Sequence, residues 1–550
     1  MMTSTFEHEL APNPANHVPL SPLSFLKRAA QVYPERDAVI YGARRYSYRQ
    51  LHQRSCLLAS ALEQVGVQPG ERVAILAPNI PEMLEAHYGV PGAGAVLVCI
   101  NIRLEARSIA FILRHCAAKV LICDREFGAL AQQALAMLES PPLLVGIEDS
   151  QAEGGELAHV LDYESFLAQG DPGRPLAAPQ NEWQSIAINY TSGTTGDPKG
   201  VVLHHRGAYL NACAGALVFQ FGPRSVYLWT LPMFHCNGWS HTWAVTLSGG
   251  THVCLRKVQA DAIHAAIAEH AVTHMSAAPV VMSMLIHAEP AGVAQAASVS
   301  LITGGAAPPS AVIAAMEARG FSITHAYGMT ESYGPSTLCL WQPGIDELPL
   351  EARARFMSRQ GVAHPMLEEA SVLDLDTGRA VPADGATLGE LVVRGNTVMK
   401  GYLDNPEATR SALANGWLHT GDLAVLHSDG YVEIKDRAKD IIISGGENIS
   451  SLEIEEVLYL HPAVIEAAVV ARPDARWGET PQAFVTLRDD ALASTSGEDL
   501  IRWCRVHLAH FKAPRHVSLM ALPKTATGKI QKFVLREQAR QEATTADAEP

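Results

Sequence analysis

Residues 190–200, Tyr-Thr-Ser-Gly-Thr-Thr-Gly-Asp-Pro-Lys-Gly, constrain this chain more than any other stretch. Residues 185–189 before them alternate between polar and apolar and predict a strand, and an apolar run resumes at Val201. Glycines let backbone N–H groups approach an anion closely, and hydroxyl side chains add donors, so the stretch predicts a phosphate-binding loop. It differs from the common ATPase loop because Pro198 precedes Lys199, where that pattern has a glycine. A polar hairpin loop is the plainer alternative.

The composition is that of a globular protein with more than one domain. The chain has 550 residues, of which 48% are hydrophobic and 18% charged. The formal net charge of −15 argues against a nucleic-acid partner, because phosphate backbones select basic surfaces. Nine scattered cysteines without a Cys-x-x-Cys pair favour free thiols in a reducing compartment. The sequence shows no secretion signal and no run of membrane-spanning length, and it ends in Ala-Glu-Pro rather than Ser-Lys-Leu. We therefore expect a cytoplasmic protein.

Short apolar strands alternate with helical segments along most of the chain. Buried strands are predicted at residues 72–76, 95–100 and 120–123. Residues 48–65 have helical spacing that stops at Gly66. This alternation predicts an α/β fold with parallel sheets covered by helices on both faces. Residues 389–395 and 398–402 are expected to be strands of a smaller, β-rich subdomain, and the proline-rich residues 1–20 a loose N-terminal arm.

Two glycine-bearing segments follow predicted strands in the middle of the chain. One strand runs into residues 304–306 and another into residues 326–331, Ala-Tyr-Gly-Met-Thr-Glu. Ligands bind at the ends of strands in open α/β sheets. Tyr327 offers a ring for stacking and Thr330 offers a hydroxyl. Glu331 supplies a carboxylate suited to Mg²⁺, which takes one or two carboxylates plus phosphate oxygens.

Residues 231–239, Leu-Pro-Met-Phe-His-Cys-Asn-Gly-Trp, are rich in aromatic side chains. His235, Cys236 and His241 lie within seven residues and invite a metal-binding interpretation, but their spacing fits no known ligand set. The aromatic density fits the wall of an apolar ligand pocket better. The alternative is that Trp239 and Trp243 are ordinary core side chains.

Five segments occur in the order of the signatures of the adenylate-forming superfamily, which the chain resembles over about residues 20–540. This superfamily includes acyl-CoA synthetases, nonribosomal-peptide adenylation domains and firefly-type luciferases. The five segments are residues 190–200, 326–331, 417–423, 436–440 and 523–530. The resemblance implies an AMP-binding domain at residues 21–437, built of parallel sheets between helices plus the β-rich subdomain. It also implies a small, mobile α+β domain at residues 438–550.

The resemblance implies a role for particular residues. Those implied to bind ATP or AMP are Thr191, Ser192, Gly193, Thr194, Thr195, Gly196, Lys199, Gly304, Gly305, Ala306, Ala326, Tyr327, Gly328, Thr330, Asp422, Arg437 and Lys529. Asp422 would accept both ribose hydroxyls, and Glu331 with Thr191 would hold Mg²⁺. The acid pocket is implied to contain His235, Trp239, Gly305 and Gly328. CoA is implied to lie beside Ser444, Gly445, Gly446, Glu447 and Trp477, with Lys439 as the hinge between the domains.

The implied activity joins a carboxylic acid to coenzyme A in two steps. The acid attacks the α-phosphorus of ATP and pyrophosphate leaves, with Lys529 as the mobile catalytic lysine and Thr191, Glu331 and His235 as the other catalytic groups. The small domain then rotates about Lys439, and the CoA thiol displaces AMP. ATP, Mg²⁺ and CoA are the expected cosubstrates and cofactor. Family members are often dimers, which leaves a homodimer open.

The sequence leaves the acid open. Residues 234–239, Phe-His-Cys-Asn-Gly-Trp, resemble those of synthetases for short- to medium-chain fatty, branched or methylthio-alkanoic acids, including 3-methylmercaptopropionyl-CoA ligases. The bulky Trp239 and Trp243 argue against a long tunnel. An aryl acid is the alternative substrate. A fatty-acyl-AMP ligase that does not use CoA, and a non-catalytic protein that binds acyl-adenylates, are the alternative functions.

Overall fold

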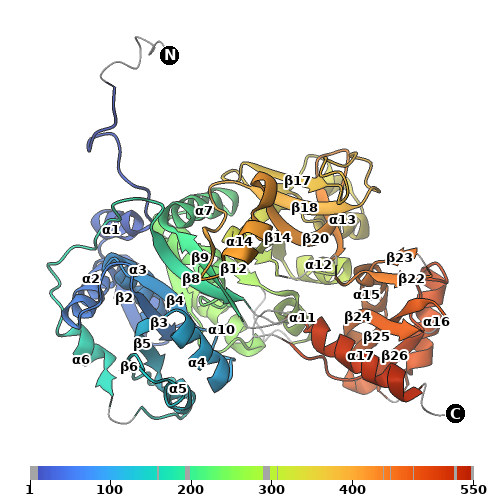
Figure 1. Ribbon diagram of the computed structural model, residues 1–550, viewed down its shortest axis with the longest axis horizontal. Helices are drawn as coiled ribbons and strands as arrows, with labels where there is room; N and C mark the ends of the chain where they lie inside the picture. The colour runs from blue at the N-terminus through green and yellow to red at the C-terminus, as the bar shows by residue number, and fades with distance from the viewer. Residues whose placement is uncertain are drawn as a thin grey trace.

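The computed structural model describes most of the chain and contains two large sheets, a small four-stranded sheet and a C-terminal sheet (Figure 1). The described residues are 10–157, 160–191, 198–288, 298–305, 308–437, 439–445, 447–474, 476–492, 494–524 and 529–546. Residues 10–20 contain a turn and otherwise irregular backbone, and the rest of the expected N-terminal arm lies outside the described residues. No helix among the described residues is long and apolar enough to cross a membrane.

The first large sheet has nine strands within this part of the chain. They are β1 (Asp37–Tyr41), β2 (Arg44–Ser47), β10 (Val226–Trp229), β11 (Thr251–Cys254), β12 (His274–Ala277), β13 (Val299–Thr303), β14 (Phe321–Met329), β15 (Gly334–Leu338) and β16 (Val362–Ala363). Their spatial order is β16-β15-β14-β13-β12-β10-β11-β1-β2. The central pairs run parallel, while β2, β15 and β16 are antiparallel at the edges.

The second large sheet repeats this design with eight described strands. They are β3 (Arg72–Leu76), β4 (Val96–Cys99), β5 (Ala118–Asp124), β6 (Leu143–Ile147), β7 (Leu161–Asp162), β8 (Ser185–Thr191), β9 (Lys199–His204) and β19 (Gly401–Tyr402). Their order is β19-β9-β8-β4-β3-β5-β6-β7, and the strands from β8 to β7 run parallel. The antiparallel β8–β9 pair forms the two sides of the predicted phosphate loop.

A four-stranded antiparallel sheet follows, in the order β17-β18-β20-β21. Its strands are β17 (Glu369–Leu373), β18 (Gly389–Arg394), β20 (Leu418–Leu426) and β21 (Val432–Arg437). Residues 389–395 were expected here and do form β18. Residues 398–402 were also expected here, but this prediction is wrong. Only β19 is a strand, and it extends the second large sheet by pairing with β9, because Lys400 N donates to Val202 O on that strand.

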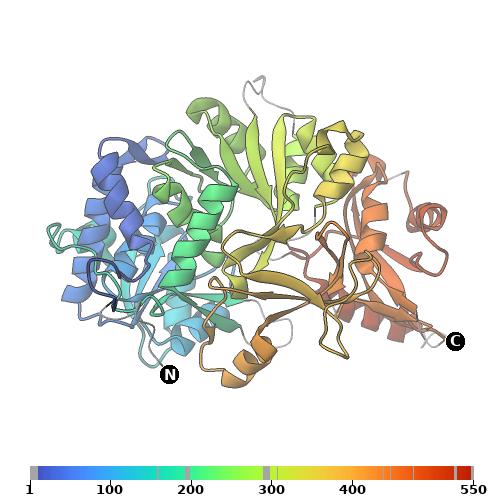
Figure 2. The same cartoon turned by 90° about the horizontal axis from the view of Figure 1, so that it is seen from above.

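The C-terminal sheet contains β22 (Ile442–Ser444), β23 (Glu447–Ile449), β24 (Val464–Asp474), β25 (Gly478–Leu487) and β26 (His516–Leu519). Three helices pack with it, namely α15 (Ser451–Tyr459), α16 (Gly497–His507) and α17 (Lys532–Ala546). We call this unit the small domain and the preceding part the large domain. Figures 1 and 2 show the small domain at the end of the molecule opposite the N-terminal helices.

Fourteen helices are described in the large domain. They are α1 (Leu23–Val32), α2 (Tyr48–Gln64), α3 (Pro81–Gly92), α4 (Ala106–His115), α5 (Gly128–Leu135), α6 (Tyr163–Leu167), α7 (His205–Val218), α8 (Cys236–Trp239), α9 (His241–Leu247), α10 (Ala260–His270), α11 (Pro279–His287), α12 (Ser310–Glu317), α13 (Leu350–Met357) and α14 (Pro406–Ala412). Helix α2 shows why they form where they do. Ser47 and Gln50 make a reciprocal capping box at its start, and Gly66, with φ +87°, lies just beyond its end.

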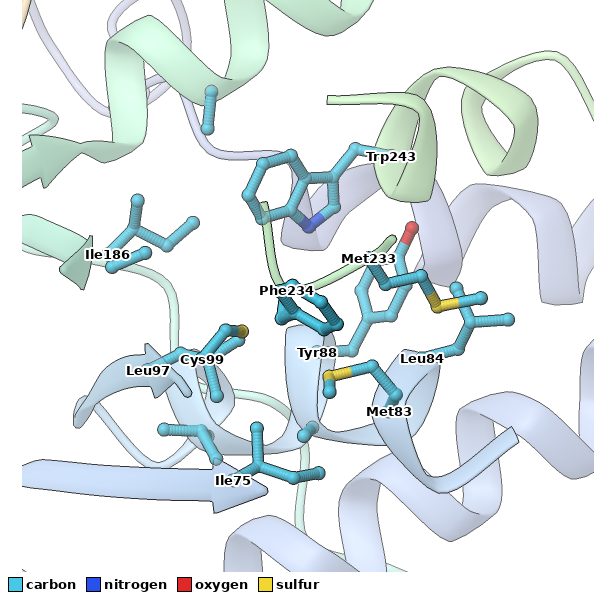
Figure 3. Close-up of a cluster of buried hydrophobic side chains, with 14 of the residues drawn as sticks. Ile75, Met83, Leu84, Tyr88, Leu97, Cys99, Ile186, Met233, Phe234 and Trp243 are labelled. Carbon is cyan, nitrogen blue, oxygen red and sulfur yellow. The ribbon is translucent and has the colours of Figure 1, made fainter. Parts of the chain in front are cut away.

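The main hydrophobic core lies between the two large sheets. It joins residues of both sheets to the buried faces of α1, α2, α3, α7 and α9. Two further cores cover the outer faces, with α10 to α13 on the first sheet and α4 and α5 on the second. Figure 3 shows part of the main core, where Phe234 lies near Met83 and Tyr88. The predicted α/β fold with a large domain of helix-covered parallel sheets and a smaller C-terminal domain is confirmed.

Candidate active site

The predicted phosphate loop begins and ends at the antiparallel β8–β9 pair. Thr191, the last residue of β8, is directly opposite Lys199, the first residue of β9. The Lys199 ammonium lies 4.9 Å from the centre of the Tyr402 ring. Ser192, Gly193, Thr194, Thr195 and Gly196 lie outside the described residues, so their phosphate contacts stay a prediction.

Tyr402 also contacts the predicted metal ligand. Its hydroxyl donates to Glu331 Oε1 at 2.8 Å, while Met399 N donates to the Glu331 carbonyl at 2.8 Å. Glu331 is only 7% exposed; the Tyr402 hydrogen bond orients its carboxylate, and the Met399 hydrogen bond holds its backbone. A single oriented carboxylate fits Mg²⁺, which completes its shell with phosphate oxygens and water. Sequence reasoning missed Tyr402, because nothing in residues 398–402 indicated that this strand returns to the phosphate loop.

Three predicted nucleotide residues meet at the end of the four-stranded sheet. Tyr327 donates its hydroxyl to Asp422 Oδ2 at 2.6 Å, and Arg437 Nε lies 3.0 Å from Asp422 Oδ1. Pairing of β20 with β21 sets Asp422 opposite Arg437. Burial and the nearby Asp422 charge raise the pKa of Tyr327 well above its usual value, so the phenol stays protonated and donates.

Two glycines, Gly305 just after β13 and Gly328 in β14, allow a neighbouring group to approach the backbone closely. A Cβ at Gly328 would lie 1.8 Å from the Gly334 carbonyl oxygen, so only glycine fits there. Gly305 has φ +81° and open space around its Cβ position. Gly304 and Ala326 are buried beside it, whereas Ala306 lies outside the described residues.

The aromatic segment contains a run of left-handed backbone at residues 236–240. Cys236, Asn237, Trp239 and Ser240 all have φ between +46° and +60°, as does Gly238. Non-glycine residues rarely adopt this region, and such strain clusters at ligand sites. Cys236 Sγ lies 3.3 Å from Thr330 Oγ1, which connects this segment to the second signature. Trp239 is buried, and its ring would lie 3.0 Å from a Cβ at Gly304.

A buried polar network holds this strained segment. Asn189 Nδ2 donates to Asn237 Oδ1 at 2.6 Å, and Asn237 Nδ2 donates to His87 Nε2 at 3.0 Å. His87 Nδ1 donates in turn to the Met83 carbonyl at 2.7 Å, which requires a neutral imidazole. Burial lowers the pKa of His87 to about 4, in agreement with that tautomer. Nothing in the sequence indicated a role for His87, because a histidine on a buried helix normally belongs to the core.

The charge of Lys529, in the small domain, interacts with residues of the large domain. Removal from bulk water, followed by repulsion from Arg437, lowers the pKa of Lys529 to about 8. The lysine residue is still exposed to solvent overall, which weakens the first of these effects. The Lys529 charge in turn acts on His235, whose pKa burial and this cation lower to about 4. His235 is therefore neutral at physiological pH. Thus Lys529 lies near Arg437 of the fourth signature and His235 of the aromatic segment, both in the large domain.

The residues expected to contact CoA lie together on the small domain. Gly445 has φ +61°, and its N–H donates to the Trp477 carbonyl at 2.8 Å. Ser444 pairs with Gly478, and Glu447 is exposed at the start of β23. In the part of the chain that is described, their contacts lie within the small domain and do not reach Asp422. Gly446 falls outside that part.

Lys439 lies in the connection between β21 and β22, at the boundary of the two domains. Partial burial and the neighbouring Arg437 cation lower its pKa. The next residue, Asp440, forms an ion pair with Arg536 on α17. The connection is therefore attached to the small domain immediately after Lys439.

Comparison with known proteins identifies the class. The family model of the AMP-binding enzyme matches residues 26–403, and the model of the AMP-binding enzyme C-terminal domain matches residues 453–529. The chain belongs to the AMP-binding enzyme family. It is an AMP-forming acid–thiol ligase, an ATP-dependent acyl-CoA synthetase.

Relatives of known description align over nearly the whole chain. The chain is 51% identical over 545 residues to acetate/butyrate–CoA ligase AAE7 of Arabidopsis thaliana, with 96% of each chain covered. It is 50% identical over 550 residues to acetate–CoA ligase CCL3 of Humulus lupulus, with 97% of each covered. Among solved structures, the anthranilate CoA ligase AuaEII with anthranoyl-AMP superposes with a TM-score of 0.84 at 26% identity, covering 96% of this chain and 99% of that one.

The expectation of a cytoplasmic protein is contradicted by these relatives. AAE7, AAE11, acyl-activating enzyme 5 and the benzoate–CoA ligase of Arabidopsis thaliana are all described as peroxisomal. The expectation rested on the lack of a recognised targeting segment, and such a lack gives no positive evidence for the cytoplasm.

Proposed function

We propose that this ligase activates short-chain and branched aliphatic acids, with Trp239 limiting the length of the acid. The observation that carries the proposal is the position of Trp239, a buried side chain packed against the Gly304 and Gly334 backbone at the end of the central strands. An indole fixed there shortens any apolar channel that starts at Gly305. Relatives described as acetate/butyrate– and 2-methylpropanoate–CoA ligases, the latter 46% identical, support the same size range.

ATP binding is proposed for the residues that meet around Glu331 and Asp422. Tyr327 would stack on adenine, Asp422 and Arg437 would bind the ribose, and Lys199 with the preceding loop would bind the β- and γ-phosphates. Glu331 and Thr191 would hold Mg²⁺, which supplies neutralisation of phosphate charge when bound. The solved structure of MatB from Rhodopseudomonas palustris is described as ATP-bound, which supports this proposal. It superposes with a TM-score of 0.81 at 26% identity, covering 95% of this chain and 99% of that one.

In the first step, the carboxylate oxygen attacks the α-phosphorus and the bond to pyrophosphate breaks. Both reactants are anions, so positioning and charge neutralisation supply most of the catalysis. The Lys529 ammonium would bridge the carboxylate and an α-phosphate oxygen. The neutral His235 beside it offers a hydrogen bond without a second cation, which suits an apolar acid pocket.

In the second step, the CoA thiol attacks the acyl carbonyl and AMP leaves. Rotation about Lys439 would withdraw Lys529 and bring Ser444, Gly445 and Trp477 toward the adenylate. Arg476 and Arg515 lie 4.8 and 5.3 Å from the Trp477 ring centre and add positive charge for an anionic cosubstrate.

An aryl acid is the alternative substrate, and one relative, 45% identical, is described as a benzoate–CoA ligase. The test is a panel of acetate, butyrate, 2-methylpropanoate, 3-methylthiopropanoate, octanoate, palmitate and benzoate, scored by AMP formation with and without CoA. We expect CoA-dependent AMP with the acids of two to five chain atoms and little with palmitate. Preference for benzoate would replace the aliphatic proposal, and AMP release that ignores CoA would identify an acyl-AMP ligase.

A further inference from the structure

The last strand of the large domain directs neighbouring side chains to two different sites. On β21, Arg437 contacts Asp422 in the proposed ribose site. Successive side chains of a strand point to opposite faces. Asp436, the residue before it, accordingly contacts the small domain instead, and it is only 2% exposed.

Asp436 binds the first turn of α15 across the domain boundary. Its Oδ2 accepts hydrogen bonds from Ser451 N at 2.6 Å and from Ser451 Oγ at 2.7 Å. A carboxylate at a helix N-terminus satisfies free N–H groups and interacts favourably with the helix dipole. Ser450 Oγ also donates to the Lys435 carbonyl, so two adjacent strand residues hold this helix end.

Ser451 in turn contacts the start of the helix that follows the Lys529 loop. Lys532 Nζ donates to Ser451 Oγ at 2.6 Å and lies 2.7 Å from Glu455 Oε1. Nearby carboxylates, Glu455 foremost and then Asp436, outweigh burial and raise the pKa of Lys532, so it keeps its charge. The loop that carries Lys529 runs from Lys524 to Ile530, and these two residues pair in an antiparallel bridge. The loop therefore ends two residues before Lys532.

We propose that Asp436, Ser451 and Lys532, which we call the inter-domain triad, position Lys529 for the adenylation step. Lys532 is three residues from Lys529, and its ammonium contacts Ser451, which Asp436 holds in turn. This chain of contacts fixes the end of the Lys529 loop relative to the ribose site. Because Asp436 precedes Lys439 and the other two residues follow it, rotation about Lys439 must break the Asp436–Ser451 contacts. The triad therefore favours the adenylation orientation over the thioester-forming one.

The experiment separates the two half-reactions and rests on the proposed function. Variants S451A and D436N are assayed for acid-dependent ATP–pyrophosphate exchange and for thioester formation from supplied butyryl-AMP and CoA. We expect the rate of ATP–pyrophosphate exchange to fall roughly tenfold or more, because each substitution removes charge-assisted hydrogen bonds that exist only in the adenylation orientation. Thioester formation should be unchanged or faster, because the competing orientation gains population.

The matched control is K512Q. Lys512 also pairs with a glutamate of α15, Glu453, at 2.8 Å, but both residues belong to the small domain. This variant should leave the ratio of the two half-reactions unchanged. An equal fall of both half-reactions in S451A, or the same ratio in S451A and K512Q, would overturn the proposal.

Hydrogen exchange measured on the full-length protein provides a readout that does not depend on activity. Exchange at residues 520–532 should increase in S451A and K532Q relative to wild type and K512Q. If hydrogen exchange at residues 520–532 is the same in S451A and K532Q as in wild type, the proposed role of the inter-domain triad is contradicted, whatever the two activity assays show. If the wild-type protein shows no ATP–pyrophosphate exchange with any acid, the proposed function fails. The hydrogen-exchange measurement still tests the inter-domain triad in that case.

Discussion

Asp422 accepts a hydrogen bond from Tyr327 at 2.6 Å on one carboxylate oxygen and contacts Arg437 at 3.0 Å on the other. These three residues come from two strands of the four-stranded sheet and from the end of β14 in the first large sheet. The carboxylate is therefore held in one orientation by two different sheets. A ligand that needs both oxygens, such as a ribose diol, finds them already arranged.

Replacing Asp422 with Asn should weaken ATP binding strongly. An amide has only one acceptor oxygen, so its NH2 group must face either Arg437 or the Tyr327 hydroxyl. We expect kcat/KM for ATP to fall by about 10- to 100-fold, since hydrogen bonds to charged groups contribute about 1.5–3 kcal/mol. Pyrophosphate release at varied ATP measures this. Tyr327→Phe keeps the ring and should lose less; a larger loss there would place the main role on the phenol.

The pKa of Lys529 predicts an alkaline limit for adenylation. With a pKa lowered to about 8, the lysine loses its proton, and its positive charge, as the pH rises through that value. We expect kcat/KM for ATP to be level below this pH and to fall about tenfold per unit above it. The neutral His235 adds no ionisation between pH 6 and 8, since its pKa is lowered to about 4.

Lys529→Arg is the control for this limit, because arginine stays protonated over the whole range. The variant should be slower but without the alkaline fall. Pyrophosphate release measured from pH 6 to 9.5 distinguishes the two proteins. An alkaline fall that persists in Lys529→Arg would assign the ionisation to another group.

The sequence predicted the parts of the site that depend on strand order. Residues 326–331 and 417–423 follow or form strands, so their meeting at one end of the fold is a consequence of the topology. The contacts of Tyr402 with Glu331 and of His87 with Asn237 could not be predicted in this way. Each joins segments separated by 71 or 150 residues, and each depends on side-chain packing that no local pattern records. The strand β19 was misassigned for a related reason, because two residues carry too little periodicity to indicate a sheet.

The polar network around Asn237 should affect both the free energy of unfolding and the binding of the acid. Asn237→Ala removes the hydrogen bonds to Asn189 and His87 and leaves both buried without these partners. We expect the free energy of unfolding to fall by about 1–3 kcal/mol. Since residues 236–240 hold Trp239, KM for the acid should rise while KM for ATP stays within about twofold. Denaturant unfolding and the two KM values test this, and an equal rise of both KM values would contradict it.

Trp239 gives the sharpest test of the acid specificity. Trp239→Leu keeps an apolar side chain but removes the ring that packs against the Gly304 backbone, so longer acids should gain room. Each buried methylene contributes about 0.8 kcal/mol, which is roughly fourfold in kcat/KM. The ratio of hexanoate to acetate should therefore rise by an order of magnitude or more, measured by CoA-dependent AMP formation. Trp243→Phe, a change at a buried core tryptophan on the following helix α9, is the matched control and should leave the ratio unchanged. If Trp239→Leu lowers activity with every acid by the same factor, Trp239 supports the fold of the pocket and does not limit the length of the acid.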